Sequence, residues 1–481
     1  MVFSTDSAPK FSLKGRDHGR QRQCATVLLA VSLVLGSCSS RNTVPEGMLG
    51  YVRGFLGGVV ADEPRAATIG RDVLSAGGTA VDAAVAVFFT MAVTRPSVAG
   101  LGSQGQCLLF SDASKQVETL DFTARDGVAG APRGMFAMHA KYGKLRWEQL
   151  VASGESLARF GFPVSRGFAR DLSGAAAEIA KSPDLVRLYR QADGSLPGEG
   201  VFLQQLDLAA TLSLLRRAPG DFYSGSFARQ YAEGAQGQGL SVTGDMLRGY
   251  APEWRDTIQV NHGLLTTHFT PTPGGAFAAR MWTALAARDA WRDARPEARP
   301  ALVADVALRA MPEGVTQLPV PTAPAGASFV TADRYSATVA CAFSMGQPFG
   351  TGRMIPGTGI LPAAPLPAAE QLALAPMLAI NPRVNKMFFA AAAAGGAAAP
   401  TATVQTALGV LAGGQSLSQA LAAPRVHPVT SGTVLREPPP VLGVVNGFNC
   451  PKGLISPGGE TPEAICEVAA DRRGFGLALQ Q

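Results

Sequence analysis

The spacing of apolar and polar residues predicts a chain that mixes helices and strands. Two helices are expected over residues 66–94. The first, AATIGRDVLSA, ends before a pair of glycines, and the second, TAVDAAVAVFFTMAVT, is apolar on nearly every side and should be buried. Asp82 lies inside the second helix and needs hydrogen-bond partners there. A glycine-rich turn then leads into two strands, CLLF and VETLDF. The pattern indicates a buried helix packed on a hairpin.

The following segments continue this alternation. Residues 133–235 are mostly amphipathic and predict helices, and residues 257–270, TIQVNHGLLTTHFT, predict one strand that ends at prolines. Residues 311–327 are rich in Pro, Gly and Ala and predict an extended, exposed linker. Two strands, SFVTAD and SATVACAFS, are expected after this linker, joined by a turn at Asp333-Arg334. The later run AAAAAGGAAAP is interpreted as a tightly packed segment.

The N-terminal segment, residues 1–37, reads as an export signal. A basic stretch precedes the apolar run ATVLLAVSLVLG, which is too short for an ordinary membrane-spanning helix and fits a signal peptide. The sequence Leu35-Gly36-Ser37-Cys38 resembles the bacterial lipobox, whose cysteine is acylated. We therefore expect a lipid anchor at Cys38, a tether over residues 38–57 and a periplasmic location, at the outer membrane because no aspartate follows Cys38. A simple signal peptide with a chance cysteine is the alternative.

Charge and cysteine usage agree with export and exclude some functions. About half of the formal net charge of +6 lies in residues 1–37, so the remaining charge is too weak to indicate nucleic-acid binding. Cys450 and Cys466 flank a loop rich in Gly and Pro and are expected to form a disulfide in an oxidising compartment. Cys107 and Cys341 lie in apolar runs and are expected to be buried free thiols. The histidines are scattered, so neither a metal site nor a cofactor is expected.

Several blocks of the sequence together resemble the gamma-glutamyltranspeptidase family. The run LSAGGTAVDAAVAVFFTMAVTRPSVAGLGSQGQCLLF is similar to the N-terminal signature of the family. The blocks that follow it in the family's order are TLDF, KYGKLRWEQL, ARFGFPVS, QLDLAATL, PGTGIL and LSQALAAPRVH. Because the blocks keep their order and spacing over roughly residues 58–430, a chance match of generic helices and turns is disfavoured.

This resemblance implies an α+β fold of the Ntn-hydrolase type, an αββα sandwich with two stacked antiparallel sheets between helical layers. Residues 58–310 would correspond to the large subunit and residues 328–481 to the small subunit, intertwined in one domain. In the family the precursor cuts itself, and the new N-terminal threonine of the small subunit is the nucleophile. The reaction is transfer or hydrolysis of a γ-glutamyl group, typically from glutathione.

The nucleophile position carries no hydroxyl in this chain. In the family the nucleophile precedes the PGTGIL-like loop by about thirty residues, and counting back from Pro356 leads to Gly326. The motif Thr266-Thr267-His268-Phe269 resembles a nucleophile motif but lies ninety residues before Pro356, so it is interpreted as an ordinary strand. Ser328 is the fallback nucleophile, since related cephalosporin acylases use serine. A structural hydroxyl at a strand entry is the favoured interpretation of Ser328, and Thr331 is a weaker candidate.

The predicted pocket has also lost polar groups of the family. Thr123 stands where the family has an arginine, and Gly346 replaces an asparagine. The segment PAAPLPAA, residues 362–369, replaces an acidic segment, and Leu372-Ala373 replaces a pair of serines. The glycine pair that supplies oxyanion amides in the family persists as Gly395-Gly396. Because a γ-glutamyl donor carries an α-carboxylate and an α-ammonium group, these losses predict weak recognition of such a donor.

Two functional hypotheses follow. In the first, the protein is a lipid-anchored member of the family that has lost catalysis, stays uncleaved and has a binding or scaffold role toward an unknown ligand or protein of the envelope. In the second, it is a self-processing amidohydrolase or γ-glutamyl enzyme of altered specificity that uses Ser328 with the amides of Gly395 and Gly396. A third reading, an active enzyme that uses Thr266, would require cleavage before that residue.

Overall fold

The computed structural model describes residues 57–124, 126–321, 325–366, 370–438, 441–454 and 466–480. The predicted signal peptide, Cys38 and nearly all of the tether lie outside the described residues. Arg125, two residues beyond Thr123 and considered as a replacement for the family arginine, also lies outside them.

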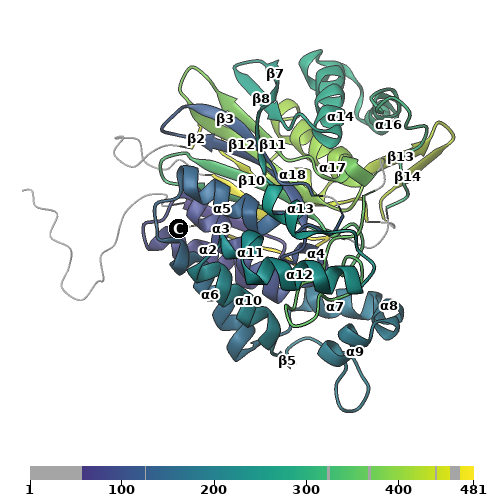
Figure 1. Cartoon of the computed structure of the whole chain (residues 1–481). Coiled ribbons are helices and arrows are strands. Elements are labelled where there is room, and N and C mark those ends of the chain that lie inside the picture. The colour runs from purple at the N-terminus through teal and green to yellow at the C-terminus, as the bar shows by residue number, and fades with distance from the viewer. Residues whose placement is uncertain are drawn as a thin grey trace, which may run out of the picture. The chain divides into compact units, whose positions relative to one another are not determined.

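Two antiparallel sheets organise the described part of the chain (Figure 1). The first has seven strands in the spatial order β17 (Leu477–Gln480), β1 (Gly57–Ala61), β9 (Gly326–Asp333), β10 (Thr338–Ser344), β2 (Gln104–Ser111), β3 (Gln116–Asp121) and β6 (Glu253–Asp256). The second has six strands in the order β16 (Glu467–Ala470), β15 (Val444–Asn449), β12 (Lys386–Ala394), β11 (Met377–Asn381), β8 (Leu265–Phe269) and β7 (Ile258–His262). Each sheet contains strands from before and from after the linker.

Helices cover the outer face of each sheet (Figure 1). The helices on the side of the first sheet are α2 (Pro64–Ser75), α3 (Ala80–Thr94), α4 (Pro96–Ala99), α5 (Gly130–Tyr142), α6 (Trp147–Phe160), α7 (Arg166–Gly174), α8 (Ala176–Lys181), α9 (Pro183–Tyr189), α10 (Leu206–Arg217), α11 (Asp221–Ser224), α12 (Ser226–Gly237) and α13 (Gly244–Gly249). Those on the side of the second sheet include α14 (Pro273–Trp282), α16 (Arg299–Arg309), α17 (Ala398–Ala407) and α18 (Leu417–Ala422). No helix among the described residues is long and apolar enough to cross a membrane.

Three apolar cores correspond to the three interfaces between these four layers. One core joins the first sheet to its helices, and a second joins the second sheet to its own helices. The third lies between the sheets and includes Val60, Leu108 and Val330 from the first sheet with Leu378 and Phe448 from the second. The architecture is therefore an αββα sandwich, as the sequence predicted.

Helix α3 shows how the buried apolar segment of the sequence is accommodated. All its residues are buried, and the predicted need of Asp82 for partners is met at the first turn. Thr79 and Asp82 form a capping box, and the Asp82 carboxylate also accepts hydrogen bonds from the backbone N–H groups of Lys144 and Leu145. A buried carboxylate is tolerated there because the helix N-terminus supplies donors that need an acceptor.

Two sequence-based expectations are wrong. Residues 257–270 form two strands, β7 and β8, instead of one, because Gly263 adopts a positive φ of 58° and the chain turns back on itself. Cys107 and Cys341 are joined in a disulfide instead of being free thiols. They lie directly opposite each other on the neighbouring strands β2 and β10, which places their side chains on one face of the sheet.

A second disulfide joins Cys450 with Cys466. It closes the chain at the two ends of the loop rich in Gly and Pro and lies at the end of β15, beside the start of β16. Residues 311–321 of the predicted linker contain no helix or strand, as expected, but Gly326 and Ala327, which were assigned to the linker, belong to β9. Leu318 is buried and its N–H donates to Val429 of β13 (Val426–Thr430).

Candidate functional site

A row of residues crosses the inner face of the first sheet. Ser328, Ala342, Gln106, Asp121 and Glu253 lie directly opposite one another on β9, β10, β2, β3 and β6. Opposite residues in antiparallel strands project to the same face, and Ser328 contacts the second sheet, so this row faces the space between the sheets.

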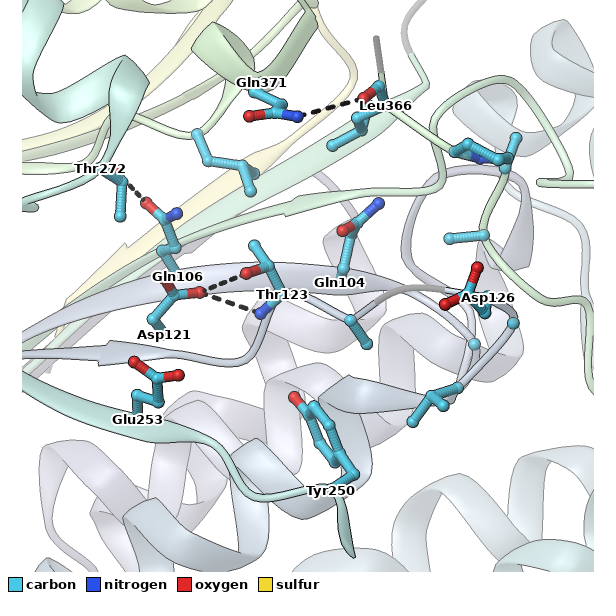
Figure 2. A pocket seen from close by; sticks show the side chains of 18 of the residues that line it. Gln104, Gln106, Asp121, Thr123, Asp126, Tyr250, Glu253, Thr272, Leu366 and Gln371 are labelled. Carbon is cyan, nitrogen blue, oxygen red and sulfur yellow. Dashed lines mark hydrogen bonds between the residues drawn. The ribbon is translucent and has the colours of Figure 1, made fainter. Parts of the chain in front are cut away.

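A cavity of about 900 Å³ opens at one end of this row. It is lined by Gln104, Gln106, Asp121 and Glu253 from the strands of the first sheet and by Thr272 from the segment after β8 (Figure 2). Its volume lies within the usual range for sites that bind small molecules. The cavity is therefore the candidate functional site.

Several of the predicted departures from the family pattern meet in this cavity. Thr123, Ala363 and Ala364 all line it. Thr123 is turned toward its own strand, since its backbone N–H and its hydroxyl both donate to Asp121 Oδ1, at 3.0 and 2.8 Å. Leu372 is instead part of the apolar core beneath the second sheet. The family resemblance thus pointed to residues that line this cavity but did not identify its polar groups.

The polar groups that sequence reasoning missed are Gln104, Gln106, Asp121, Tyr250 and Glu253. The two glutamines are two residues apart on β2, just before the apolar run CLLF, so both lie on the same face of a buried strand. This spacing was the sequence feature that could have indicated a polar site. Burial, with the charges of Asp121 and Glu253 adding to it, raises the pKa of Tyr250, so its hydroxyl stays neutral.

The residues proposed for catalysis do not line the cavity. Neither Gly326 and Ser328 nor Gly395 and Gly396 are among its described lining residues. Three strand spacings separate Ser328 from Asp121 in the row, which corresponds to about 14 Å.

Ser328 belongs to a separate buried polar cluster. Its hydroxyl donates to the carbonyl oxygen of Ala392 at 3.2 Å and accepts from Asn446 Nδ2 at 2.9 Å. Its backbone N–H donates to Asp62 Oδ2 at 2.7 Å, and Asn446 Nδ2 also donates to Asp62 Oδ1 at 2.8 Å. Burial raises the pKa of Asp62, although Arg95 and these hydrogen bonds act in the opposite direction. The cluster links the two sheets.

The glycine pair lies at the end of β12, where the chain turns into α17. Gly395 and Gly396 have φ values of 127° and 61°, which favour glycine. A Cβ atom on Gly395 would lie 2.7 Å from the Cα of Gly443, so close packing of the backbone also requires glycine there. The pair follows Ala392, whose carbonyl accepts the hydrogen bond from Ser328, by three and four residues.

The Thr266-Thr267-His268-Phe269 motif lies in an interior strand. Strand β8 pairs with β7 on one side and β11 on the other, and Thr267 and His268 are buried. The hydroxyl of Thr266 donates to Asn261 Oδ1 at 3.0 Å across the hairpin. Among the described residues, no group of three or more His, Cys, Asp or Glu side chains is placed to hold a metal ion.

Two stacked antiparallel sheets between helical layers define an Ntn-hydrolase fold. The crystal structure of cephalosporin acylase from Bacillus halodurans matches it with a TM-score of 0.71 and 19% sequence identity, over 91% of this chain and 98% of that one.

Over residues 66–291, a little under half of its length, the chain is similar to the gamma-glutamyltranspeptidase family. The sequence model of this family, gamma-glutamyltranspeptidase, matches residues 66–126 and 124–291. The glutathione hydrolase proenzyme of Bacillus subtilis is 29% identical over 299 residues, which are 54% of this chain and 50% of that protein. Glutathione hydrolase 3 of Arabidopsis thaliana is 30% identical over 244 residues, which are 46% of this chain and 38% of that protein. The matched region thus spans half or less of the length of these relatives.

Proposed function

We propose that this protein is a catalytically silent member of the gamma-glutamyltranspeptidase family that stays uncleaved and binds a ligand in the cavity between its sheets. The observation that carries the proposal is at the start of β9. This strand begins at Gly326, which has no hydroxyl, and the first hydroxyl along the strand, that of Ser328, is fully buried and hydrogen-bonded to the second sheet.

The environment of Ser328 supports a structural role. An Ntn nucleophile must become the first residue of a new chain, with its amine free to act as a base. Here Gly326 and Ala327 both pair with β10, so the strand continues on the N-terminal side of Ser328. The N–H group of Ser328 is already engaged by the Asp62 carboxylate.

The backbone at Gly326 supports the same conclusion. A Cβ atom placed on Gly326 would lie 2.3 Å from the carbonyl oxygen of Phe343 on the neighbouring strand, and this is too close for any side chain without a shift of the backbone. A threonine nucleophile at this position would therefore require β9 and β10 to move apart.

The charges around the cavity disfavour a γ-glutamyl donor. Among its described lining residues, Arg255 is the single cation, and its Nε donates to Glu253 at 2.9 Å. Asp121, Asp126 and Glu253 are the acidic residues of the lining. An α-carboxylate needs a free cation or several donors, so glutathione and related donors should bind weakly.

The competing function is that of a self-processing amidohydrolase that uses Ser328 with the amides of Gly395 and Gly396. The name of the Bacillus subtilis relative, a proenzyme, favours it. In that case Asp62 and Asn446 would be the groups that hold the nucleophile, and cleavage would have to expose Ser328 to the cavity.

Incubation of the purified protein with γ-glutamyl-p-nitroanilide tests the proposal. We expect one full-length band on a denaturing gel, unchanged on storage, and nitroaniline release no faster than that of the Ser328→Ala variant. Two fragments that meet near residue 327, with release abolished by Ser328→Ala, would instead establish the amidohydrolase.

We also propose that the mature protein is held at the outer membrane by a lipid on Cys38, on the periplasmic side. The lipobox-like sequence before Cys38 supports this placement. In a Gram-negative host, the protein should partition into detergent and its Cys38→Ser variant into the aqueous phase. Equal partitioning of the two forms would contradict a lipid anchor.

A further inference from the structure

We propose that the cavity between the sheets binds a small polar molecule that carries a primary amine or guanidinium cation, held by Asp121 and oriented by Gln104 and Gln106. This inference rests on the proposed binding function and specifies the ligand. It follows from polar groups that are buried in the cavity with bonding capacity left over.

Gln104 is the clearest sign of a missing partner. Its side chain is 7% exposed and lines the cavity, yet its amide forms no hydrogen bond with any described residue. Figure 2 shows this side chain extending into the cavity, with no bond drawn to its amide. Because no protein group satisfies it, this amide needs hydrogen bonds from water or from a ligand in the cavity. Gln104 therefore offers one acceptor and two donors to an occupant of the cavity.

Gln106 and Asp121 each have one polar side-chain atom in a hydrogen bond and one without a partner among the described residues. Gln106 Oε1 accepts a hydrogen bond from the hydroxyl of Thr272 at 2.8 Å. This bond fixes the orientation of the amide, so its Nε2 donor is directed away from Thr272. Asp121 Oδ1 accepts both bonds from Thr123, and no described residue donates to Oδ2. Gln106 is 3% exposed and Asp121 is 8% exposed, so neither free atom is at an open surface.

Tyr250 also lines this cavity, with its hydroxyl group buried in the cavity wall. Its oxygen is buried and has no hydrogen-bond partner among the described residues. Since Tyr250 lines the cavity together with Asp121 and Glu253, a neutral phenol lies beside two carboxylates. A phenol can donate to a ligand oxygen or accept from a ligand N–H.

The charges select the kind of ligand. Arg255 forms an ion pair with Glu253, and its charge also acts on Asp121. No cation among the described residues forms an ion pair with Asp121, a buried carboxylate that lies between Gln106 and Glu253 in the row. A cationic N–H donor satisfies its free Oδ2 with a charge-assisted bond. The donors on Gln104 and Gln106 then suit a neutral acceptor next to that cation, such as a carbonyl or hydroxyl oxygen. A ligand carboxylate would instead meet the acidic lining.

Isothermal titration calorimetry with L-argininamide and L-arginine tests this selection. The two probes share the cationic groups and differ in whether a carboxamide or a carboxylate is present. We expect saturable binding of L-argininamide, at least about 10-fold tighter than that of L-arginine. The Asp121→Asn variant keeps the acceptor for Thr123 and should weaken L-argininamide binding by about 10-fold or more. Glu118→Gln, on the same strand but outside the cavity, is the matched control and should bind normally.

The Gln104→Met variant separates a binding role from a structural role, because melting temperature and ligand binding can both be measured. Removing an amide that has no partner within the protein should leave the melting temperature unchanged or raise it, while L-argininamide binding weakens several-fold. Failure of L-argininamide to bind, equal binding by both probes, or unchanged binding by both Asp121→Asn and Gln104→Met would overturn the proposal. These outcomes do not depend on chain cleavage. The ligand assignment can therefore fail while the proposal of an uncleaved protein without catalytic activity still holds.

Discussion

The backbone N–H of Ser328 donates to the carboxylate of Asp62 at 2.7 Å, although the two residues are 266 positions apart in sequence. Asn446, from the second sheet, donates to both of them. This contact joins β9, the segment after β1 and β15 at the interface of the two sheets. The first hydroxyl along β9 thus has a clear structural use.

Ser328→Ala should lower the free energy of unfolding by about 1–2 kcal/mol, because Asn446 loses an acceptor and Ala392 loses a donor inside the protein. Urea denaturation followed by circular dichroism measures this change. Ser431→Ala, at an exposed turn, is the control and should change stability by less than about 0.5 kcal/mol. Equal stability of the two variants would indicate that the Ser328 hydroxyl contributes nothing to the fold.

Asp171→Asn should destabilise the protein strongly. Arg95 donates to both carboxylate oxygens of Asp171, at 2.7 and 3.0 Å, and the two side chains are each 6% exposed. Removing one charge of a buried pair leaves the other uncompensated, and we expect a loss of about 3 kcal/mol. The matched control is Glu199→Gln, whose partner Arg166 lies on the same helix α7. Because that pair is 54–68% exposed, its loss should change stability by less than about 1 kcal/mol. Similar losses in both variants would contradict this assignment.

The two disulfides should contribute unequally to stability. Cys107 and Cys341 close 234 positions of chain, whereas Cys450 and Cys466 close 16. Restriction of the unfolded chain predicts about 5 kcal/mol for the first and about 3 kcal/mol for the second. Denaturation of Cys107→Ala/Cys341→Ala and Cys450→Ala/Cys466→Ala double variants measures the difference. Free thiols at 107 and 341 in the native protein, found by alkylation under denaturing conditions, would refute the first bridge.

Stability should fall on acidification below about pH 6.5. Burial lowers the pKa of His268 and of His427 to about 4. Between this value and about 6.5 the unfolded chain binds protons that the folded protein does not, so stability is lost as pH falls through this window, on the order of 3 kcal/mol for each histidine.

The comparison that isolates this effect is native protein against His268→Gln/His427→Gln, at pH 7.5 and 4.5. Burial raises the pKa values of Asp62 and Asp333, which acts in the opposite direction and is common to both proteins. The native protein should lose more stability than the variant between the two pH values. Parallel losses would show that these histidines do not titrate with depressed pKa values.

Much of the fold was accessible from the sequence because it depends on local patterns. The glycine pair after α2, the apolar α3 and the turn at Asp333-Arg334 each follow from spacing and turn chemistry. The hairpin at Gly263 was missed because a single glycine inside a strand-like run does not by itself indicate a reversal. The long-range disulfide was missed because its strands pair across 234 positions.

The candidate site was accessible only in part. Resemblance to a family pointed to Thr123 and to Ala363-Ala364, which do line the cavity. The groups that define its chemistry come from β2, β3 and the segment before β6, and which atoms of Gln104 or Asp121 remain unpaired depends on neighbours such as Thr123 and Thr272. Sequence periodicity can place such side chains on a face but cannot reveal what their atoms bond to.

Peptide mass spectrometry of the purified, aged protein shows directly whether the chain before Ser328 is cut. Trypsin should release residues 310–334 as one peptide, since no Lys or Arg lies between Arg309 and Arg334. We expect this peptide to be intact and as abundant as its neighbours. Its replacement by a peptide with a new N-terminus at Gly326 or Ser328 would show that the chain is cut and that the protein processes itself.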